Sequence, residues 1–516
     1  MARYDVLIAG AGPTGLVLAL WLSHLGARFR IVDKASEPGT TSRAIGVQAR
    51  TLEFYNQVSL AQKLVERGLK FTTANLWVRG RPIAKVSFGD MGVGLSPYPY
   101  TLMFPQDEHE RLLIARLDEL GVTVERPLEL VVFAERADCI VAQLKRPDGS
   151  IEMCDASYIA GCDGARSIVR EAVNAGFPGG TYAHIFYVAD VVGTGSVINK
   201  ELHVALDDAA FLAAFPMAGE GHARLIGTVR EEAAHANRTL QWSDVSDIIL
   251  KRLKIEISKI NWFSTYHVHH RVARNFRKGR AFLLGDAAHI HSPVGAQGLN
   301  TGLGDAVNLA WKLAAVCQQR ASARLLDTYE PERIAFAHRL IATTDRAFKL
   351  VTSDGALARW IRTRVVPFAM PKLFGRQWVR RLMFRTISQT AIEYRRSALS
   401  CGAAGNVHAG DRLPWVKLEG VGNLADNYVS LCALDWQVHV YGNASPGLQA
   451  LCRDRGVTLR AFPWRDAMGS AGIAANAAYL IRPDGYVGCA DTSAEAKALA
   501  QYMDTWELRP SRAKPV

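Results

Sequence analysis

The chain has 516 residues, which is too long for a single hydrophobic core, so we expect two or three domains. With 49% hydrophobic and 21% charged residues, its composition is that of a globular protein, and no run approaches the roughly 18 apolar residues of a membrane span. The first predicted strand begins at Tyr4, which leaves no room for a signal peptide, and we expect a cytoplasmic protein.

Charge and cysteine usage narrow the class of ligand. The net charge of +12 comes from dispersed basic residues without a recognisable nucleic-acid-binding module, so we expect anionic small molecules to benefit from it and no nucleic acid to bind. The eight cysteines include no CxxC pair and no metal-ligand spacing, so neither a disulfide framework nor a metal site is expected.

The first thirty-odd residues predict a strand, a glycine-rich turn and a helix. Tyr4 to Ala9 reads YDVLIA, the apolar run of a buried parallel strand, and Leu16 to Leu25 repeats Leu, Val and Ala at helical spacing. GAGPTG, at residues 10–15, lies between them. The next predicted strand, Arg28 to Val32, is followed directly by Asp33.

This pattern is typical of a dinucleotide site. Gly10 allows the tight turn, Gly12 lets the backbone approach a pyrophosphate, and Gly15 lets the helix pack on the strand. The unpaired amides at the start of the helix point at the phosphates, and a carboxylate at Asp33 accepts both ribose hydroxyls of an adenosine. The motif itself leaves open whether the dinucleotide is NAD or FAD.

Three further polar residues lie near predicted strand ends. Arg43 follows the adenosine-binding acid, where it either meets a phosphate or adenine or is a solvated loop arginine. Gln106 lies between Pro105, which stops a strand, and an acidic helix start. Asp163 belongs to CDGARS, at residues 162–167, between a strand and a helix, and taken alone this motif is a turn with an N-cap.

Between Thr181 and Arg274 the pattern changes to short strands of alternating hydrophobicity. It predicts an antiparallel sheet inserted into the dinucleotide domain, with one face forming a wall of a pocket at the domain junction. Phe211, Phe215 and Met217 alternate along one of these strands and project from one face. They either line that pocket or belong to the core of the sheet.

The chain then returns to the dinucleotide domain. A buried strand, AFLLG, ends at Asp286, and a glycine-rich loop follows from Pro293 to Gly304. The loop runs into a helix predicted from Asp305 to Val316, whose amide dipole points at whatever the loop holds. A strand-end acid and a helix N-terminus therefore converge at this loop.

The three motifs GAGPTG at 10–15, CDGARS at 162–167, and GDAAH with PVGAQGLNTG at 285–302 stand in the order and at roughly the spacing of one known family. With them the chain resembles the FAD-dependent aromatic hydroxylases, single-component flavoprotein monooxygenases of the para-hydroxybenzoate hydroxylase type. The resemblance covers residues 3 to about 345. It implies an α/β fold with a Rossmann-like FAD-binding domain at 1–180 and 275–345 and a substrate-binding sheet domain at 181–274.

The resemblance also implies residue roles toward non-covalent FAD. The first motif and Asp33 bind its ADP part, Asp163 serves both FAD and the passing NAD(P)H, and Asp286 binds the ribityl and pyrophosphate region. The amides at residues 298–300 face the pyrimidine edge of the flavin. The full predicted cofactor-binding set is Gly10, Gly12, Pro13, Gly15, Asp33, Lys34, Arg43, Gln106, Asp163, Asp286, Gly298, Leu299 and Asn300.

The rest of the chain predicts two further parts. Residues 346–400 form a basic helical segment in which Glu393 is the single acid between Arg359 and Arg396. Its apolar residues favour helices that brace the flavin domain or meet a second copy of the chain, and the alternative is an amphipathic surface on an anionic membrane. Residues 401–516 resemble the degenerate thioredoxin-like domain of some of these hydroxylases, with a structural or assembly role because no CxxC is present.

The implied reaction is the NAD(P)H- and O2-dependent hydroxylation of a phenolic or related electron-rich aromatic compound through a flavin C4a-hydroperoxide, with the protein orienting the ring and excluding water. A base near the substrate oxygen would help, and His291 is the candidate, although a satisfied structural histidine is its alternative. The predicted substrate residues are Phe211, Phe215, Met217, Pro293, Val294 and Gly295.

Other classes explain less of the sequence. A flavin halogenase would need a Trp-x-Trp pair, which none of the 11 tryptophans forms. An NAD(P)-dependent dehydrogenase leaves the second and third motifs without a role, while another FAD oxidoreductase such as an epoxidase or dehydrogenase stays an alternative. A non-catalytic flavin-binding protein is a third alternative. It would be distinguished by adding NAD(P)H, which would not bleach its bound FAD.

Overall fold

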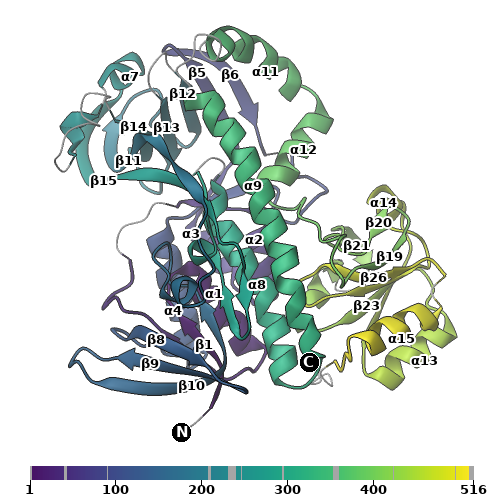
Figure 1. The fold of residues 1–516 in the computed structure, drawn as a ribbon. Helices are drawn as coiled ribbons and strands as arrows, with labels where there is room; N and C mark the ends of the chain where they lie inside the picture. Colours follow the sequence, from purple (N-terminus) through teal and green to yellow (C-terminus); the bar gives the residue numbers. More distant parts are fainter. Residues whose placement is uncertain are drawn as a thin grey trace.

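The computed structural model describes residues 3–39, 44–89, 91–206, 211–229, 240–245, 247–292, 296–352, 360–421, 424–493 and 495–510. These residues form three parts, each built on its own main sheet, and the long helices α8 and α9 lie between them in Figure 1. None of the described helices has both the length and the apolar character needed to cross a membrane.

The first part is built on a seven-stranded sheet of order β16-β17-β10-β1-β2, with β9 and then β8 continuing from β10. β1 pairs in parallel with β2 and with β10, and β10 pairs in parallel with β17. The carboxyl ends of these four strands therefore meet at one edge. The strands are β1 (Tyr4–Ala9), β2 (Phe29–Val32), β8 (Glu129–Glu135), β9 (Ile140–Lys145), β10 (Ile151–Gly161), β16 (Arg277–Lys278) and β17 (Ala281–Leu283).

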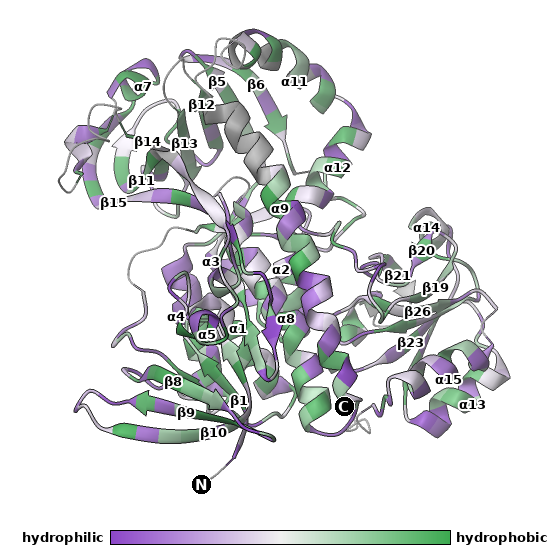
Figure 2. Ribbon diagram, in the orientation of Figure 1, coloured by the Kyte–Doolittle hydropathy of each residue, from purple (hydrophilic) through white to green (hydrophobic). Residues whose placement is uncertain are grey.

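Helices α1 and α8 pack against each other in the largest hydrophobic core, and every residue of α1 from Gly15 to Leu22 is buried. Figure 2 shows strands and helices of this part with long hydrophobic stretches. A small sheet of order β3-β7-β4 completes it. Its elements are α1 (Pro13–His24), α2 (Ala49–Gln57), α3 (Ala61–Arg67), α4 (Gln106–Glu119), α5 (Ile168–Ala172), α8 (Gln297–Cys317), α9 (Tyr329–Thr352), β3 (Gly46–Val47), β4 (Leu69–Phe71) and β7 (Thr101–Met103).

Helix α8 begins at Gln297, so the expectation of a loop up to Gly304 and a helix from Asp305 is wrong. A Cβ atom on Gly302 would lie 2.5 Å from Thr14 Oγ1, and one on Gly304 would lie 3.2 Å from the Arg333 guanidinium. The glycines thus allow close packing inside a helix. This packing outweighs their low helix propensity, which costs about 1 kcal/mol each.

The second part is an eight-stranded sheet of order β18-β15-β11-β14-β13-β12-β5-β6. It extends beyond the predicted range 181–274, because residues 73–87 add β5 and β6, and β5 pairs in parallel with β12 while the other pairs are antiparallel. Helix α7 (Asp247–Arg252) belongs to the same part. The strands are β5 (Thr73–Val78), β6 (Arg81–Ser87), β11 (Gly179–Thr194), β12 (Leu202–Leu206), β13 (Phe211–Pro216), β14 (His222–Thr228), β15 (Glu256–Val272) and β18 (His289–Ile290).

The third part is a six-stranded sheet of order β20-β19-β26-β25-β23-β24, with a separate β21-β22 pair. The predicted small α/β domain is therefore present, and its thioredoxin-like character stays a prediction. The basic segment before it forms α11 (Val366–Phe374) and α12 (Gln377–Ile387). The elements are β19 (Cys401–Ala404), β20 (Val407–His408), β21 (Lys417–Val421), β22 (Leu424–Asp426), β23 (Gln437–Tyr441), β24 (Thr458–Phe462), β25 (Ala478–Ile481), β26 (Val487–Asp491), α13 (Pro446–Arg455), α14 (Asp466–Ser470) and α15 (Ala496–Thr505).

Candidate active site

The three predicted acids follow three of the four parallel strands of the first sheet. Asp33 follows β2, Asp163 follows β10, and Asp286 follows β17. Because the carboxyl ends of these strands meet at one edge, motifs far apart in the sequence converge there. Ligands of open α/β sheets bind at this edge.

The glycine-rich turn after β1 has the geometry of a phosphate cradle. Gly10 has a φ of +99°, and a Cβ atom there would overlap the backbone of Cys162 and Asp163. A Cβ on Gly15 would overlap the carbonyl oxygen of Gly10, so the helix packs on the strand as predicted. A Cβ on Gly12 would meet nothing within 4 Å, and α1 begins there with Pro13 and without a side-chain cap. Its first amides are thus available to an anion.

Asp33 is held in place by the backbone. Its Oδ2 accepts a hydrogen bond from the Ala11 amide at 2.7 Å, and its Oδ1 accepts one from the Ala35 amide at 2.8 Å. Both carboxylate oxygens keep further lone pairs for other donors. The carboxylate therefore both closes the cradle and stays able to accept ribose hydroxyls.

A pocket of about 240 Å³ lies between the first and second motifs. Its lining includes the apolar residues Val32, Leu128, Leu130 and Ile168, and also Asp33 with the cations Lys34 and Arg166. Apolar residues together with a ribose-accepting carboxylate and two cations fit the adenosine half of a dinucleotide. The remaining lining residues are Ala9, Gly10, Gly12, Glu129, Cys162, Asp163 and Gly164.

Asp163 lines this pocket and also caps α5. Its Oδ1 accepts from the Ser167 hydroxyl at 2.5 Å, and its Oδ2 accepts from the Val169 amide at 3.2 Å, while Ser167 is the N-cap residue. Burial raises the pKa of Asp163, and these hydrogen bonds counter part of that increase. Arg170 then donates to the Ala287 carbonyl at 3.1 Å, which joins this motif to the next.

The third motif contacts the first through Thr14. Cβ atoms on Gly285 and Gly302 would lie 2.6 Å and 2.5 Å from Thr14 Oγ1, so both positions need glycine. Asp286 follows Gly285 and is exposed at the carboxyl edge of the sheet. The turn that carries Asp286 is thereby fixed against the N-terminal ends of α1 and α8.

The predicted flavin-facing residues Gly298, Leu299 and Asn300 lie in the first turn of α8, which has no side-chain cap. The Asn300 side chain is buried, and both its oxygen and its nitrogen form hydrogen bonds within the protein. Its Oδ1 accepts from the Gln48 amide and the Thr51 hydroxyl at 2.8 and 2.7 Å, and its Nδ2 donates to the Gly46 carbonyl at 2.9 Å. Of Asn300, only the backbone is therefore available to a flavin.

Gln106 is the first residue of α4, as predicted for a strand-to-helix corner. Its Nε2 donates to Glu110 Oε1 at 2.8 Å, and its amide donates to the Ala44 carbonyl at 3.1 Å. Burial raises the pKa of Glu110. The predicted contact Arg43 lies outside the described residues, as do Pro293, Val294 and Gly295.

His291 has one nitrogen satisfied and one without a hydrogen-bond partner. Its Nδ1 lies 2.9 Å from the Ser292 carbonyl, which requires Nδ1 to donate, so Nε2 carries the lone pair. Nε2 is buried and unpaired, and a Cβ on Gly298 would lie 3.6 Å from it. Burial, with a contribution from His289, lowers the pKa of His291 to about 4. A neutral imidazole thus presents an acceptor beside the first turn of α8.

His289, by contrast, is a structural residue. Its Nε2 lies 2.7 Å from Asp305 Oδ2, and its ring stacks on Phe276 with centroids 5.8 Å apart. The same Asp305 oxygen accepts from the Gly285 amide at 3.0 Å, and its other oxygen accepts from Arg333 Nε at 2.6 Å. Asp305 therefore holds both the third motif and the histidine pair.

The predicted substrate residues of β13 lie on one face of their strand. Leu212 and Ala214 pack into the core on the opposite face. We call the first part, which carries the predicted FAD site, the flavin-binding part. Phe215 and Met217 are partly buried and pack with its residues Ile45, Phe71 and Met103. Phe211 lies apart from them, in a cluster with Phe186 and Val268.

Two arginines that hold the site were not predicted. Arg126 donates to the Ala11 carbonyl at 2.8 Å and to the Glu37 carbonyl at 2.9 Å, across the turn of the first motif. Arg224 is buried, forms a bidentate pair with Asp190 at 2.6 and 2.7 Å, and donates to the Ala44 carbonyl at 3.2 Å. Neither arginine lies in a motif. For Arg224, the available signal was an arginine on one predicted strand and Asp190 on another.

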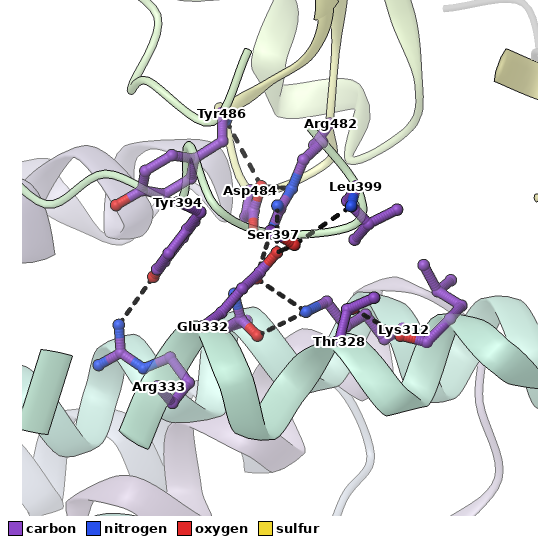
Figure 3. Close-up of polar contacts among 12 residues, drawn as sticks. Lys312, Thr328, Glu332, Arg333, Tyr394, Ser397, Leu399, Arg482, Asp484 and Tyr486 are labelled. Atoms are coloured by element: carbon purple, nitrogen blue, oxygen red, sulfur yellow. Dashed lines mark hydrogen bonds and ion pairs between the residues drawn. The ribbon is translucent and has the colours of Figure 1, made fainter. Parts of the chain in front are cut away.

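A buried polar network fixes the C-terminal part to the first part (Figure 3). Arg482, in the turn after β25, donates to Glu332 of α9 and to Asp484 in its own turn. Lys312 of α8 donates to Glu332 at 2.9 Å. Because buried charges are stable only when paired, these contacts join the two parts into one unit.

The same network continues to the site. Arg333, the next residue along α9, donates to the Tyr394 hydroxyl at 2.8 Å as well as to Asp305. The Tyr394 ring packs on Tyr486 with centroids 4.5 Å apart. Asp305 thus connects the C-terminal part to Gly285 and His289 of the third motif.

The cradle, the uncapped helices, the pocket beside Asp33 and the converging second and third motifs fit a bound dinucleotide. The chain belongs to the family described as FAD binding domain, whose model matches residues 3–344. This match confirms the extent of the predicted resemblance and decides between NAD and FAD. Among the described residues, no group of three or more acids, cysteines or histidines could hold a metal ion.

Relatives named as monooxygenases match almost the whole chain. The protein is 32% identical to 6-methylpretetramide 4-monooxygenase of Streptomyces rimosus over 99% of this chain and 95% of the relative. It resembles the solved anhydrotetracycline hydroxylase OxyS from Streptomyces rimosus, with 28% identity and a TM-score of 0.79 over 98% of this chain and 99% of that one. It also resembles aklavinone-11 hydroxylase, solved with FAD and aklavinone, with 25% identity and a TM-score of 0.78 over 97% and 98%. The protein is an FAD-dependent monooxygenase of the aromatic hydroxylase type, as predicted.

Proposed function

We propose that this monooxygenase uses NAD(P)H and O2 to hydroxylate a phenolic or similarly electron-rich aromatic compound. The observation that carries the proposal is the apolar cluster at the domain junction. Phe215 and Met217 pack with Ile45, Phe71 and Met103 and remain partly exposed, which supports an apolar slot for an aromatic ring at this junction. Bound FAD would supply the electron transfer and the activation of oxygen.

The protein's own residues supply position and proton handling. The amides at the start of α1, with Asp33 and Asp286, would hold the cofactor, and the backbone of the first turn of α8 would contact it. Phe215 and Met217 orient the substrate and exclude water from the reacting atoms. The lone pair on His291 Nε2 can accept a hydrogen bond from the substrate hydroxyl or from the flavin.

The test is a screen of phenolic compounds for substrate-stimulated NADH and NADPH oxidation by the FAD-loaded enzyme. The first compounds follow the named substrates of the relatives, 6-methylpretetramide and anhydrotetracycline among them. A product that carries one oxygen atom from labelled O2 supports the proposal. Stimulated oxidation that yields only hydrogen peroxide across the screen, or substrate oxidation without incorporated oxygen, contradicts it.

A further inference from the structure

Among the described residues, helix α12 packs against the protein through the face that carries Phe384. Phe384 is buried, and a Cβ on Gly92 would lie 2.5 Å from its ring, so this face braces the flavin-binding part as the sequence favoured. Trp378 and Leu382, one turn apart on another face, are 62% and 57% exposed. Bracing therefore does not account for these two large apolar side chains.

The preceding residues add to this exposed apolar surface. Phe368 of α11 is 70% exposed, Trp360 is 56% exposed and Leu373 is 46% exposed. Helix α11 lies at the outer edge of the molecule in Figure 1, with α12 next to it. We call Trp360, Phe368, Leu373, Trp378 and Leu382 the α11–α12 patch.

The stretch of chain that carries the patch is basic. No Asp or Glu occurs between residues 360 and 392. The exposed cations of this stretch include Lys372, whose Nζ lies 4.0 Å from the centre of the Phe368 ring, and Arg376. Arg381 and Arg385 are exposed on α12 beside Trp378 and Leu382, and both also line a pocket whose other residues include Glu393 and Asp411.

We propose that the α11–α12 patch docks the enzyme on an anionic lipid bilayer. Tryptophan, phenylalanine and leucine side chains enter the boundary between headgroups and acyl chains, while flanking arginines and lysines contact anionic headgroups. Docking of this kind lays the helix in the plane of the interface and requires no membrane-spanning segment.

Charge argues for a bilayer over a second copy of the chain. In a two-fold symmetric dimer each patch meets its own copy, which would place Arg381 and Arg385 against an equally basic surface. Like charges across an interface oppose association. An anionic bilayer neutralises the same arginines and covers the same apolar side chains.

The experiment is vesicle flotation of the FAD-loaded enzyme. Vesicles of phosphatidylcholine mixed equally with phosphatidylglycerol should carry the protein upward, and vesicles of phosphatidylcholine alone should carry much less. Added salt should weaken the binding. The double variant Arg381→Gln/Arg385→Gln should lower the partition coefficient by about 25-fold, since each arginine near the surface contributes about fivefold. Trp378→Ser/Leu382→Ser should lower it at least about tenfold.

Matched controls change the same residue types on the C-terminal part. Arg453→Gln/Arg460→Gln removes two exposed arginines, and Trp464→Ser removes a tryptophan that is 39% exposed. Both controls should bind vesicles like the wild-type protein. FAD content and melting temperature identify any variant that fails to fold. If Trp378→Ser/Leu382→Ser fails to fold, Arg381→Gln/Arg385→Gln still tests the proposal, because both arginines are exposed.

Three outcomes would overturn the proposal. The first is a folded wild-type enzyme that does not float with the anionic vesicles. The second is an equal loss of binding in the control variants. The third is a concentration-dependent dimer in sedimentation velocity that Trp378→Ser/Leu382→Ser abolishes, because the patch would then be an interface between copies.

Discussion

Arg482 of the C-terminal part donates to both carboxylate oxygens of Glu332 on α9, at 2.8 and 3.0 Å, and both side chains are fully buried. Burial alone would raise the pKa of Glu332, but Arg482 and Lys312 hold it below its ordinary value. The carboxylate therefore compensates two buried cations at the junction between the two parts of the chain. Its loss affects both parts.

We expect Glu332→Gln to lower the free energy of unfolding by about 3–5 kcal/mol, because Lys312 and Arg482 would remain buried with too little negative charge. Denaturant titration of the FAD-loaded protein measures this change in the free energy of unfolding. Glu393→Gln is the matched control, since Glu393 forms a half-exposed pair with Arg395 at 3.1 Å and should change stability by less than about 1 kcal/mol. Equal effects of the two variants would contradict the role of Glu332.

The same residue predicts a pH dependence. A carboxyl whose pKa is lower in the folded than in the unfolded protein contributes stability above its unfolded value, and this contribution is lost as the pH falls through the folded value. For Glu332 the loss begins below the ordinary value of 4.5. Between about pH 5 and pH 3, Glu332→Gln should therefore show a shallower loss of stability than the wild-type protein.

Changing Asp33 to Ala should weaken FAD binding by about 1.5–3 kcal/mol, the range for hydrogen bonds to a charged group. Fluorescence titration of the apoprotein with FAD measures this. Asp33 also accepts the Ala11 amide, so the melting temperature of the apoprotein must be compared as well. Asp148→Ala, on an exposed turn, is the control. An unchanged FAD affinity in the Asp33 variant would remove this residue from the site.

His291 should act as a neutral group. Because burial lowers its pKa to about 4, its imidazole is uncharged throughout the range in which such an enzyme is assayed. We expect His291→Gln to reduce the hydroxylated product formed per NAD(P)H consumed while leaving the shape of the pH profile of kcat/KM unchanged. An inflection near pH 6.5 that disappears in the variant would contradict the neutral assignment.

Much of the cofactor site follows from local sequence pattern. The strand, the turn and the helix at residues 4–25 are encoded by neighbouring residues, so the cradle and Asp33 could be placed without a structure. The start of α8 could not, because Gly302 and Gly304 have low helix propensity and their value lies in contacts with Thr14 and Arg333. Those contacts join residues that are distant in the sequence.

Other features could not be predicted from the sequence, because they also depend on contacts between distant residues. The 17-residue strand β15 and the addition of β5 to the edge of the second sheet depend on strand pairing, which local alternation does not encode. The Glu332–Arg482 pair joins residues 150 positions apart. Each side chain alone is an ordinary charged residue, so nothing in the sequence marks it as buried.

The placement of the substrate gives the last prediction. Phe215 and Met217 are partly buried at the junction between the second sheet and the flavin-binding part, whereas Leu212 on the same strand is buried on the opposite face. If the first two line the slot, Phe215→Ala and Met217→Ala should raise KM for the aromatic substrate. They should also raise the fraction of NAD(P)H that is lost as hydrogen peroxide, because water would reach the reacting atoms.

Leu212→Ala separates this outcome from a general loss of packing. It removes a buried side chain and should lower the free energy of unfolding by about 2–5 kcal/mol without changing KM or the peroxide fraction. The two slot variants should lose less stability than Leu212→Ala, since their side chains are already partly exposed. If Phe215→Ala and Met217→Ala instead behave like Leu212→Ala, with lower melting temperatures and unchanged coupling, these residues are core of the sheet and the substrate binds elsewhere.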